Sequence, residues 1–238
     1  MPPTELKSGA RKMMRDNSPK LFFISIIFVG IVTIMSELQF RLLDVTNAYD
    51  QLLQHYAAGE LPGFGAYFTY LRPSGVPFAV LLWVFSSLLD AGYKSYCLKI
   101  SRGRPGEYKD IFDGFLFVGK VLLIRIITAL LTALWSILLI FPGIVASYRY
   151  RQARYILFDN PQKGALQCIR ESKQLMSGKK LDLFLVDLSF AGWLALDYLV
   201  LLILPLPFSL PIIEIWLTPY HGLTCAAFYN RLINSLTV

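Results

Sequence analysis

The most constraining feature of this chain is a series of long apolar runs, the first of which carries no charge. Leu21 to Met35 contains no charged side chain. An apolar helix needs about 20 residues to cross the hydrocarbon core of a bilayer, so we expect this helix to continue past Ser36 and the Lys20 side chain to reach the surface. A cleaved signal peptide is the alternative. No small-x-small cleavage site follows, which favours an uncleaved membrane anchor.

Further apolar segments follow along the chain and predict transmembrane helices over about 76–98, 118–141, 144–158, 181–204 and 212–232. Only 16% of the chain is charged, against roughly 25% in soluble domains. The segment 144–158 is less apolar and follows a predicted tight turn at Pro142-Gly143, and a re-entrant or interfacial helix is its alternative. The sequence predicts an all-α integral membrane protein with about six transmembrane helices in a single membrane domain, residues 1–238.

The connections between these spans differ in character. Residues 1–20 are expected to be a cytoplasmic segment whose amphipathic helix, Thr4 to Arg15, lies on an anionic membrane leaflet; a solvated basic tail is the alternative. Residues 40–75 form an extracytoplasmic loop. Residues 99–117 and 159–180 form cytoplasmic connections, and the second of them, between spans 4 and 5, contains a helix that is expected to begin at Asp159-Asn160-Pro161.

Lysine and arginine are concentrated on one side of the predicted spans. They are frequent in the three cytoplasmic segments, whereas residues 40–75 contain only Arg41 and Arg72. Cytoplasmic loops of membrane proteins carry such an excess. We therefore expect a multi-pass protein of the cell (plasma) membrane with its N-terminus and C-terminus in the cytoplasm. Because this topology accounts for the net charge of +7, no nucleic acid is expected as a partner.

Short motifs along the chain are similar to those of a known family. They are Gly92-Tyr93 through Arg102-Gly103, Asp110 to Phe115, Phe141 to Ile144, Tyr155 to Pro161, Glu171 to Gly178, Asp187 to Trp193, Pro219-Tyr220 and Ala227 to Tyr229. Together they resemble an uncharacterised bacterial multi-pass membrane family, domain-of-unknown-function family nine hundred seventy-five, found mostly in Gram-positive bacteria. The resemblance implies a six-span architecture with cytoplasmic loops and implies no particular activity.

Among the ionisable residues inside the predicted spans, five are candidates for an intramembrane polar cluster: Asp90, Lys94, Arg125, Asp187 and Asp197. Such residues are costly in a bilayer and are functional candidates for that reason. We expect Asp90, Arg125 and Asp187 to meet as one cluster between the second, third and fifth spans, while Lys94 is the i,i+4 partner of Asp90. They could form an ion relay or line a substrate cavity. Structural pairing that fixes helix register is the alternative.

A second group of candidates is the basic surface expected on the cytoplasmic side. Its members are Arg102, Arg104, Arg151, Arg154, Lys179 and Lys180. This surface could bind anionic lipid headgroups or an acidic segment of a partner protein. It could equally serve only to determine the topology.

Signatures of catalysis or of bound cofactors do not occur in the sequence. No GxSxG, P-loop, GxGxxG or HExxH pattern is present, so no enzyme and no catalytic residue is expected. Cys97, Cys168 and Cys225 follow no metal-ligand spacing, and neither His55 nor His221 belongs to a histidine cluster. We therefore expect no metal site and no cofactor.

Two functions remain compatible with these observations. The first is a non-catalytic membrane protein with an accessory or regulatory role in the cell envelope, acting through helix contacts and its basic surface. Its partners would be membrane lipids and a further membrane protein or a second copy of itself. The alternative is a small transporter or channel that uses the intramembrane charges, which predicts that these residues face one common cavity.

Overall fold

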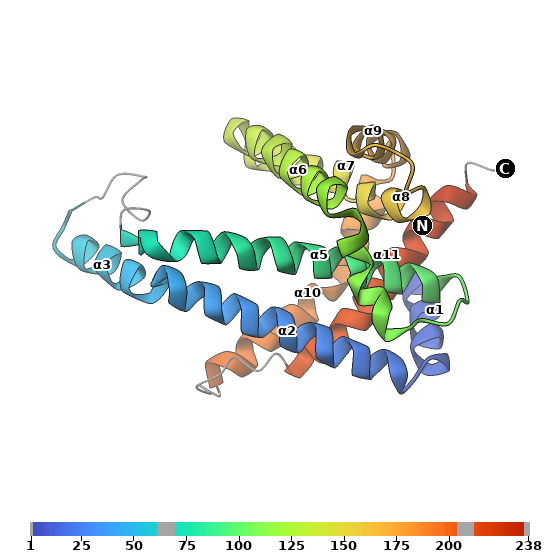
Figure 1. Ribbon diagram of the computed structural model, residues 1–238, viewed down its shortest axis with the longest axis horizontal. Helices are drawn as coiled ribbons and strands as arrows, with labels where there is room; N and C mark the ends of the chain where they lie inside the picture. Colours follow the sequence, from blue (N-terminus) through green and yellow to red (C-terminus); the bar gives the residue numbers. More distant parts are fainter. Residues whose placement is uncertain (1, 61–69, 204–211, 236–238) are drawn as a thin grey trace. The chain divides into compact units, whose positions relative to one another are not determined.

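The computed structural model describes residues 2–60, 70–203 and 212–235, and within these ranges every regular element is a helix (Figure 1). The all-α prediction is thus confirmed for the described part of the chain. The helices are α1 (Pro3–Asp16), α2 (Lys20–Leu43), α3 (Val45–Ala57), η1 (Pro73–Gly75), α5 (Val76–Ser101), η2 (Tyr108–Phe117), α6 (Val118–Leu138), α7 (Ile140–Tyr150), α8 (Ala153–Asp159), α9 (Ala165–Leu175), α10 (Lys180–Ile203) and α11 (Ile212–Asn234).

Three segments of the described chain are long and apolar enough to cross a membrane: Lys20–Leu43, Pro73–Ser101 and Tyr108–Leu138. They correspond to the first three apolar segments predicted from the sequence, although the third ends at Leu138 rather than near residue 141. Large apolar side chains project from them, and Ile34 is 69% and Leu130 65% exposed. The segments predicted as the last two spans form α10 and α11, and parts of that region lie outside the described residues.

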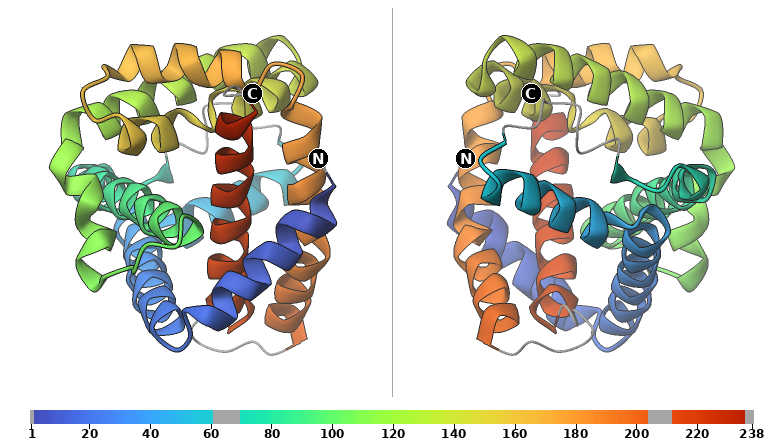
Figure 2. Two further views of the ribbon diagram at one scale, coloured as in Figure 1. Left: turned by 90° about the vertical axis from the view of Figure 1, so that its right-hand side faces the viewer. Right: turned by 90° about the vertical axis from the view of Figure 1, so that its left-hand side faces the viewer.

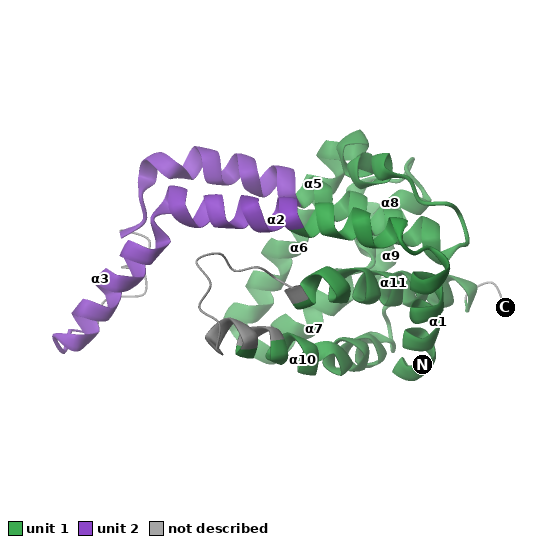
Figure 3. Cartoon of the chain, turned by 90° about the horizontal axis from the view of Figure 1, so that it is seen from below, with its two compact units in different colours: residues 1–29, 87–238 green, residues 30–86 purple. Residues whose placement is uncertain are grey.

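The chain consists of two compact units, residues 1–29 with 87–238 and residues 30–86 (Figure 3). In the second unit, the Gln39 side chain on α2 donates a hydrogen bond of 2.8 Å to the carbonyl of Ala79 on α5. Arg72 pairs with Asp44 at 2.8 Å. The loop predicted over 40–75 therefore contains regular structure, since α3 follows α2 directly at Asp44, whose φ is 56°.

In the first unit, α1 packs along α11 and also contacts α10 (Figure 2). Its apolar residues Leu6, Ala10 and Met14 are at most 4% exposed, whereas Lys12 and Arg15 remain exposed. The predicted amphipathic helix is confirmed. The expectation that its apolar face lies on a membrane leaflet is wrong, because that face is covered by the protein.

The turn expected at Pro142-Gly143 occurs instead at Leu139, where the backbone is extended between α6 and α7. Pro142 lies in the first turn of α7, where a missing N–H costs nothing. A Cβ atom on Gly143 would lie 2.0 Å from the Ser136 hydroxyl. Glycine therefore permits the close packing of the α6–α7 hairpin, and the proline lies in the first turn of α7 rather than in the connection between the helices.

The segment 144–158 is not one continuous helix. It contains most of α7 and α8, which are interrupted at Arg151 and Gln152. The 11 residues of α7 rise only about 16 Å, and this length is too short for the roughly 30 Å hydrocarbon core. The expected fourth span, as a single helix, is therefore a wrong prediction.

The helix expected to begin at Asp159-Asn160-Pro161 begins later, because α8 ends at Asp159 and α9 begins at Ala165. The Asp159 carboxylate accepts hydrogen bonds of 2.8 Å from Arg102 and 2.7 Å from Tyr229. It is engaged in tertiary contacts rather than in capping the next helix.

Candidate functional site

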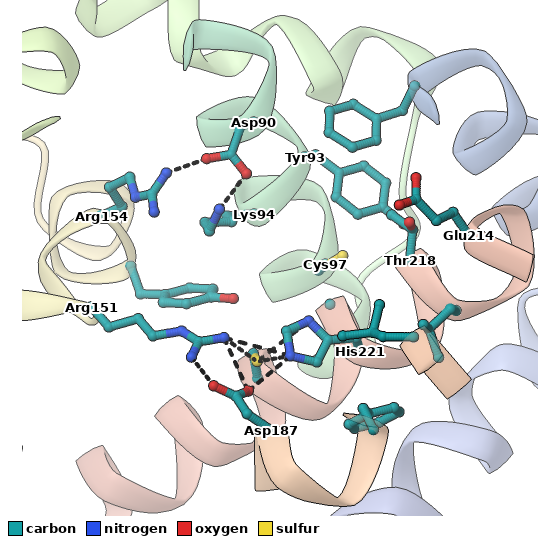
Figure 4. Close-up of a pocket in the computed structure, with 17 residues that line it drawn as sticks. Asp90, Tyr93, Lys94, Cys97, Arg151, Arg154, Asp187, Glu214, Thr218 and His221 are labelled. Atoms are coloured by element: carbon teal, nitrogen blue, oxygen red, sulfur yellow. Dashed lines mark hydrogen bonds and ion pairs between the residues drawn. The ribbon is translucent and has the colours of Figure 1, made fainter. Parts of the chain in front are cut away.

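A cavity of about 570 Å³ lies in the first unit, lined by residues of α2, α5, α8, α10 and α11 and by Arg151 between α7 and α8 (Figure 4). One end of the cavity is aromatic: Phe28 and Tyr93 stack with ring centroids 4.2 Å apart, and the Tyr93 hydroxyl lies 2.9 Å from that of Ser25. The other end holds ionisable side chains from helices that are far apart in the sequence.

Close approach of the backbone brings these helices together. A Cβ atom on Gly92 would lie 1.8 Å from the carbonyl oxygen of Ile111, so α5 and η2 are in direct backbone contact. The α11 helix also approaches α5 closely, since a Cβ on Gly222 would lie 2.8 Å from the sulfur of Cys97. Glycine at these two positions sets the spacing of α5 from η2 and α11, and thereby the width of the cavity.

Asp90 is the centre of the first charged group. It forms ion pairs with Lys94, one turn further along α5, and with Arg154 of α8. Arg125 of α6 lies 3.6 Å from the same carboxylate. Two cations that line the cavity, Lys94 and Arg154, thus share one carboxylate, and a further carboxylate, Glu214, lies near Tyr93 (Figure 4). Unbalanced charge is expensive in a low-dielectric surrounding, so the two cations favour an additional anion.

Asp187 of α10 is the centre of the second charged group. Both oxygens of its carboxylate accept from the Arg151 guanidinium, one of them at 3.2 Å. The Tyr148 hydroxyl donates to it at 2.8 Å, and the Nε2 atom of His221 lies 3.0 Å away. One cation and one carboxylate balance here, so this group is formally neutral when the imidazole is neutral.

His221 and Cys225 are functional candidates that sequence reasoning missed. They are four residues apart on α11, so both face the cavity, and the Cys225 sulfur lies 3.6 Å from the His221 Nε2 atom. The Asp187, His221 and Cys225 ligand atoms all lie within 4.8 Å of one another. The i,i+4 spacing was visible in the sequence, but nothing there related it to an aspartate on another helix.

The structure separates the predicted cluster of Asp90, Arg125 and Asp187 into two groups. Asp90, Lys94 and Asp187 line the cavity, and Arg125 pairs with Asp90 from a second cavity of about 610 Å³. The prediction of one acid–base–acid cluster is wrong, because Arg151 rather than Arg125 is the partner of Asp187. The side chain of Asp197 lies outside the described residues.

The predicted basic surface is also divided. Arg151 and Arg154 point into the cavity and pair with its two aspartates, so their assignment to the surface is wrong. Arg102 binds Asp159, and this hydrogen bond is the main reason that the pKa of Arg102 is raised. Arg104 is exposed, whereas Lys179 and Lys180 are half-buried.

The fold and the site define a class: an all-helical protein with membrane-length helices and an internal cavity lined by charged groups. Residues 137–235 match the model of a family described as "Protein of unknown function (DUF975)", which confirms the family resemblance seen in the sequence. The matched segment includes Arg151, Arg154, Asp187, His221 and Cys225. No curated protein and no solved structure shows significant similarity to the chain.

Proposed function

We propose that this protein is a non-catalytic carrier of a small anionic solute, which binds in the cavity between α5, α8, α10 and α11. The observation that carries the proposal is the convergence of Asp90, Lys94 and Arg154 with Asp187 and Arg151 on one cavity. Its volume of about 570 Å³ falls in the range of about 300–1,000 Å³ that is usual for small-molecule sites.

The charge at one end of the cavity favours an anion. Lys94 and Arg154 line this end and share the carboxylate of Asp90, whereas Glu214, a further carboxylate of the cavity, lies near Tyr93 (Figure 4). A carboxylate or phosphate group on a solute would supply the missing negative charge, and a guanidinium matches both anions with two parallel hydrogen bonds. The stacked rings of Phe28 and Tyr93 would contact the apolar part of the same solute.

The interruption between α7 and α8 supports a transport path through the cavity. Together they extend from Ile140 to Asp159, and 20 residues cover about 30 Å when helical. We infer that they act as one discontinuous span, with the break at Arg151 lying at the cavity. Broken helices in transporters place their ends at the substrate in this way. With this span counted, six spans and two cytoplasmic termini in the plasma membrane follow from the lysine and arginine distribution.

Uptake into proteoliposomes tests the proposal, with labelled succinate and inorganic phosphate as probes. We expect uptake by the wild-type protein, and its loss in Arg154→Met, because the substitution removes a cavity cation but keeps a long side chain. The matched control is Arg170→Met, which changes an exposed arginine on α9 and should leave uptake unchanged. Equal uptake in Arg154→Met and wild type would contradict the proposal.

An accessory role in the envelope is a second candidate, supported by the exposed basic side chains of Lys12 and Arg15 on α1. They lie opposite the apolar face that packs on α11, so they are available to anionic headgroups or to an acidic partner segment. A partner that copurifies in stoichiometric amount, and is lost in a Lys12→Gln, Arg15→Gln double variant, would favour this role. Retention of the partner by the double variant would exclude the basic face as its binding surface.

A further inference from the structure

The second charged group contains three side chains of the kind that bind transition metals. The ligands are the carboxylate of Asp187, the imidazole of His221 and the thiol of Cys225, and their ligand atoms lie within 4.8 Å of one another. They come from two helices in contact, α10 and α11. The pair on α11 is spaced i,i+4, so one helix face presents both.

The distances fit a tetrahedral ion. A zinc with Zn–N of about 2.0 Å and Zn–S of about 2.3 Å holds those two atoms roughly 3.5 Å apart. The His221 Nε2 and Cys225 Sγ atoms are 3.6 Å apart, and Nε2 lies 3.0 Å from the Asp187 carboxylate. A mixed set of carboxylate, imidazole and thiolate suits a divalent ion of intermediate softness, such as Zn²⁺ or Co²⁺.

One nitrogen of Arg151 already interacts with all three ligand side chains. Its Nη2 atom lies 3.2 Å from the Asp187 Oδ1 atom, 3.5 Å from the His221 Nε2 atom and 3.7 Å from the Cys225 sulfur. The guanidinium therefore supplies a positive charge to the same three atoms that would hold a metal. A metal ion bound to these three atoms would have to replace this guanidinium.

The position of Arg151 allows its side chain to withdraw. It lies between α7 and α8, and it lines the neighbouring cavity of about 610 Å³ as well as the first. Hydroxyl groups of Thr132, Ser136 and Ser147 line that second cavity. They offer hydrogen-bond acceptors to a guanidinium that has left Asp187.

A second thiol adds to the metal-binding character of this region. Cys97 of α5 is fully buried and lines the same cavity, and Gly222, next to His221, lies directly against its sulfur. Two thiols and an imidazole thus border one half of the cavity. Soft ligands of this kind select zinc and related ions over magnesium or calcium.

We propose that Asp187, His221 and Cys225 bind a divalent ion of the zinc type, in competition with the guanidinium of Arg151. Binding forms bonds from the metal to a carboxylate oxygen, an imidazole nitrogen and the sulfur. The S–H bond of Cys225 breaks and its proton passes to solvent, because the thiolate is the ligand. The site does not depend on the proposed anion transport, whose test uses Arg154.

The experiment is a titration of the purified full-length protein in detergent with Co²⁺, followed by the near-ultraviolet absorption of a cobalt–thiolate bond. Wild type should develop the band, and Cys225→Ser should lose it. His221→Ala should bind at least about tenfold more weakly, since it removes a direct ligand. Arg151→Met should bind about tenfold more tightly, because a competing positive charge is gone.

Cys168→Ser is the matched control, since Cys168 is a buried thiol on α9 outside the cavity, and it should retain the wild-type band and affinity. Each variant is first shown to be monodisperse, so that a lost band is not a lost fold. An undiminished band in Cys225→Ser, or a band that disappears in Cys97→Ser but not in Cys225→Ser, would overturn the site. Weaker cobalt binding in Arg151→Met would overturn the competition.

Discussion

Asp90 and Asp187 line the same cavity but have different surroundings. Asp90 is shared by Lys94, Arg154 and Arg125, whereas Asp187 has one arginine, a tyrosine hydroxyl and an imidazole next to a thiol. The first group therefore has an excess of positive charge and favours an anion. The second is balanced when His221 is neutral, and it contains metal ligands. Two carboxylates in one cavity thus acquire different chemistry from their neighbours rather than from their own type.

The largest expected effect is the loss of stability in Asp90→Asn. Removing this carboxylate leaves three cations without their shared partner, and uncompensated buried charge costs about 3 kcal/mol or more. Asp187→Asn leaves one cation, Arg151, without its carboxylate and keeps an amide oxygen that can accept its hydrogen bond, so we expect a smaller loss of about 1–3 kcal/mol. Thermal unfolding in detergent measures both losses. The control is Asp16→Asn, which changes an exposed residue at the end of α1. Equal losses at the two aspartates would remove the distinction between the groups.

The close helix contacts near the two charged groups should also differ in how much an added Cβ atom destabilises the protein. Gly92→Ala places a Cβ against the Ile111 backbone oxygen, whereas Gly222→Ala meets the side-chain sulfur of Cys97. Overpacking costs about 1–3 kcal/mol, and we expect the upper value at Gly92 because backbone yields less than a side chain. Gly119→Ala, which meets no atom within 4 Å, should be neutral or slightly stabilising. A larger loss at Gly222 than at Gly92 would contradict this order.

The stability that the protein gains on binding zinc should distinguish the two groups, because only the Asp187 group contains the proposed metal ligands. At a free Zn²⁺ concentration about 100 times the dissociation constant, linkage stabilises the folded state by about 2.7 kcal/mol. We expect this stabilisation in Asp90→Asn as in wild type, and its absence in Cys225→Ser. Thermal unfolding is measured for each variant with and without zinc, and a chelator is then added to show that the stabilisation is reversed. Loss of the zinc response in Asp90→Asn alone would place the metal in the other group.

The smallest effect is expected from Tyr148→Phe. This change removes one hydroxyl that donates to Asp187 at 2.8 Å, and a single such hydrogen bond contributes about 1 kcal/mol. Arg151 remains as the partner of Asp187, so the site should keep its cobalt affinity. Chemical unfolding of both proteins provides the measurement, and a loss far above 1 kcal/mol would show that Tyr148 does more than donate this bond.

Local patterns were enough to predict part of this structure. The apolar runs predicted the three membrane-length helices, because length and hydropathy alone define them. The pairing of Asp90 with Lys94 followed from their spacing of four on one helix. The amphipathic pattern of α1 predicted a helix with one buried face, although it could not identify what covers that face.

Tertiary relations could not be predicted in the same way. Arg151 and Arg154 were assigned to the surface because the positive-inside pattern counts charges and does not indicate where a side chain points. Their partners are 36 and 64 residues away. The break between α7 and α8 left no proline or glycine at Arg151-Gln152, so the segment was interpreted as one helix. His221 and Cys225 became candidates only when α10 brought Asp187 beside them.

The most direct measurement of the central claim is the affinity of succinate for Asp90→Asn and Arg154→Met, by isothermal titration. If the Asp90 group binds an anion, removal of its carboxylate should tighten binding and removal of its arginine should weaken it, so the two variants change affinity in opposite directions. If both leave affinity unchanged, or both weaken it equally, the group is a structural ion pair and the account is contradicted.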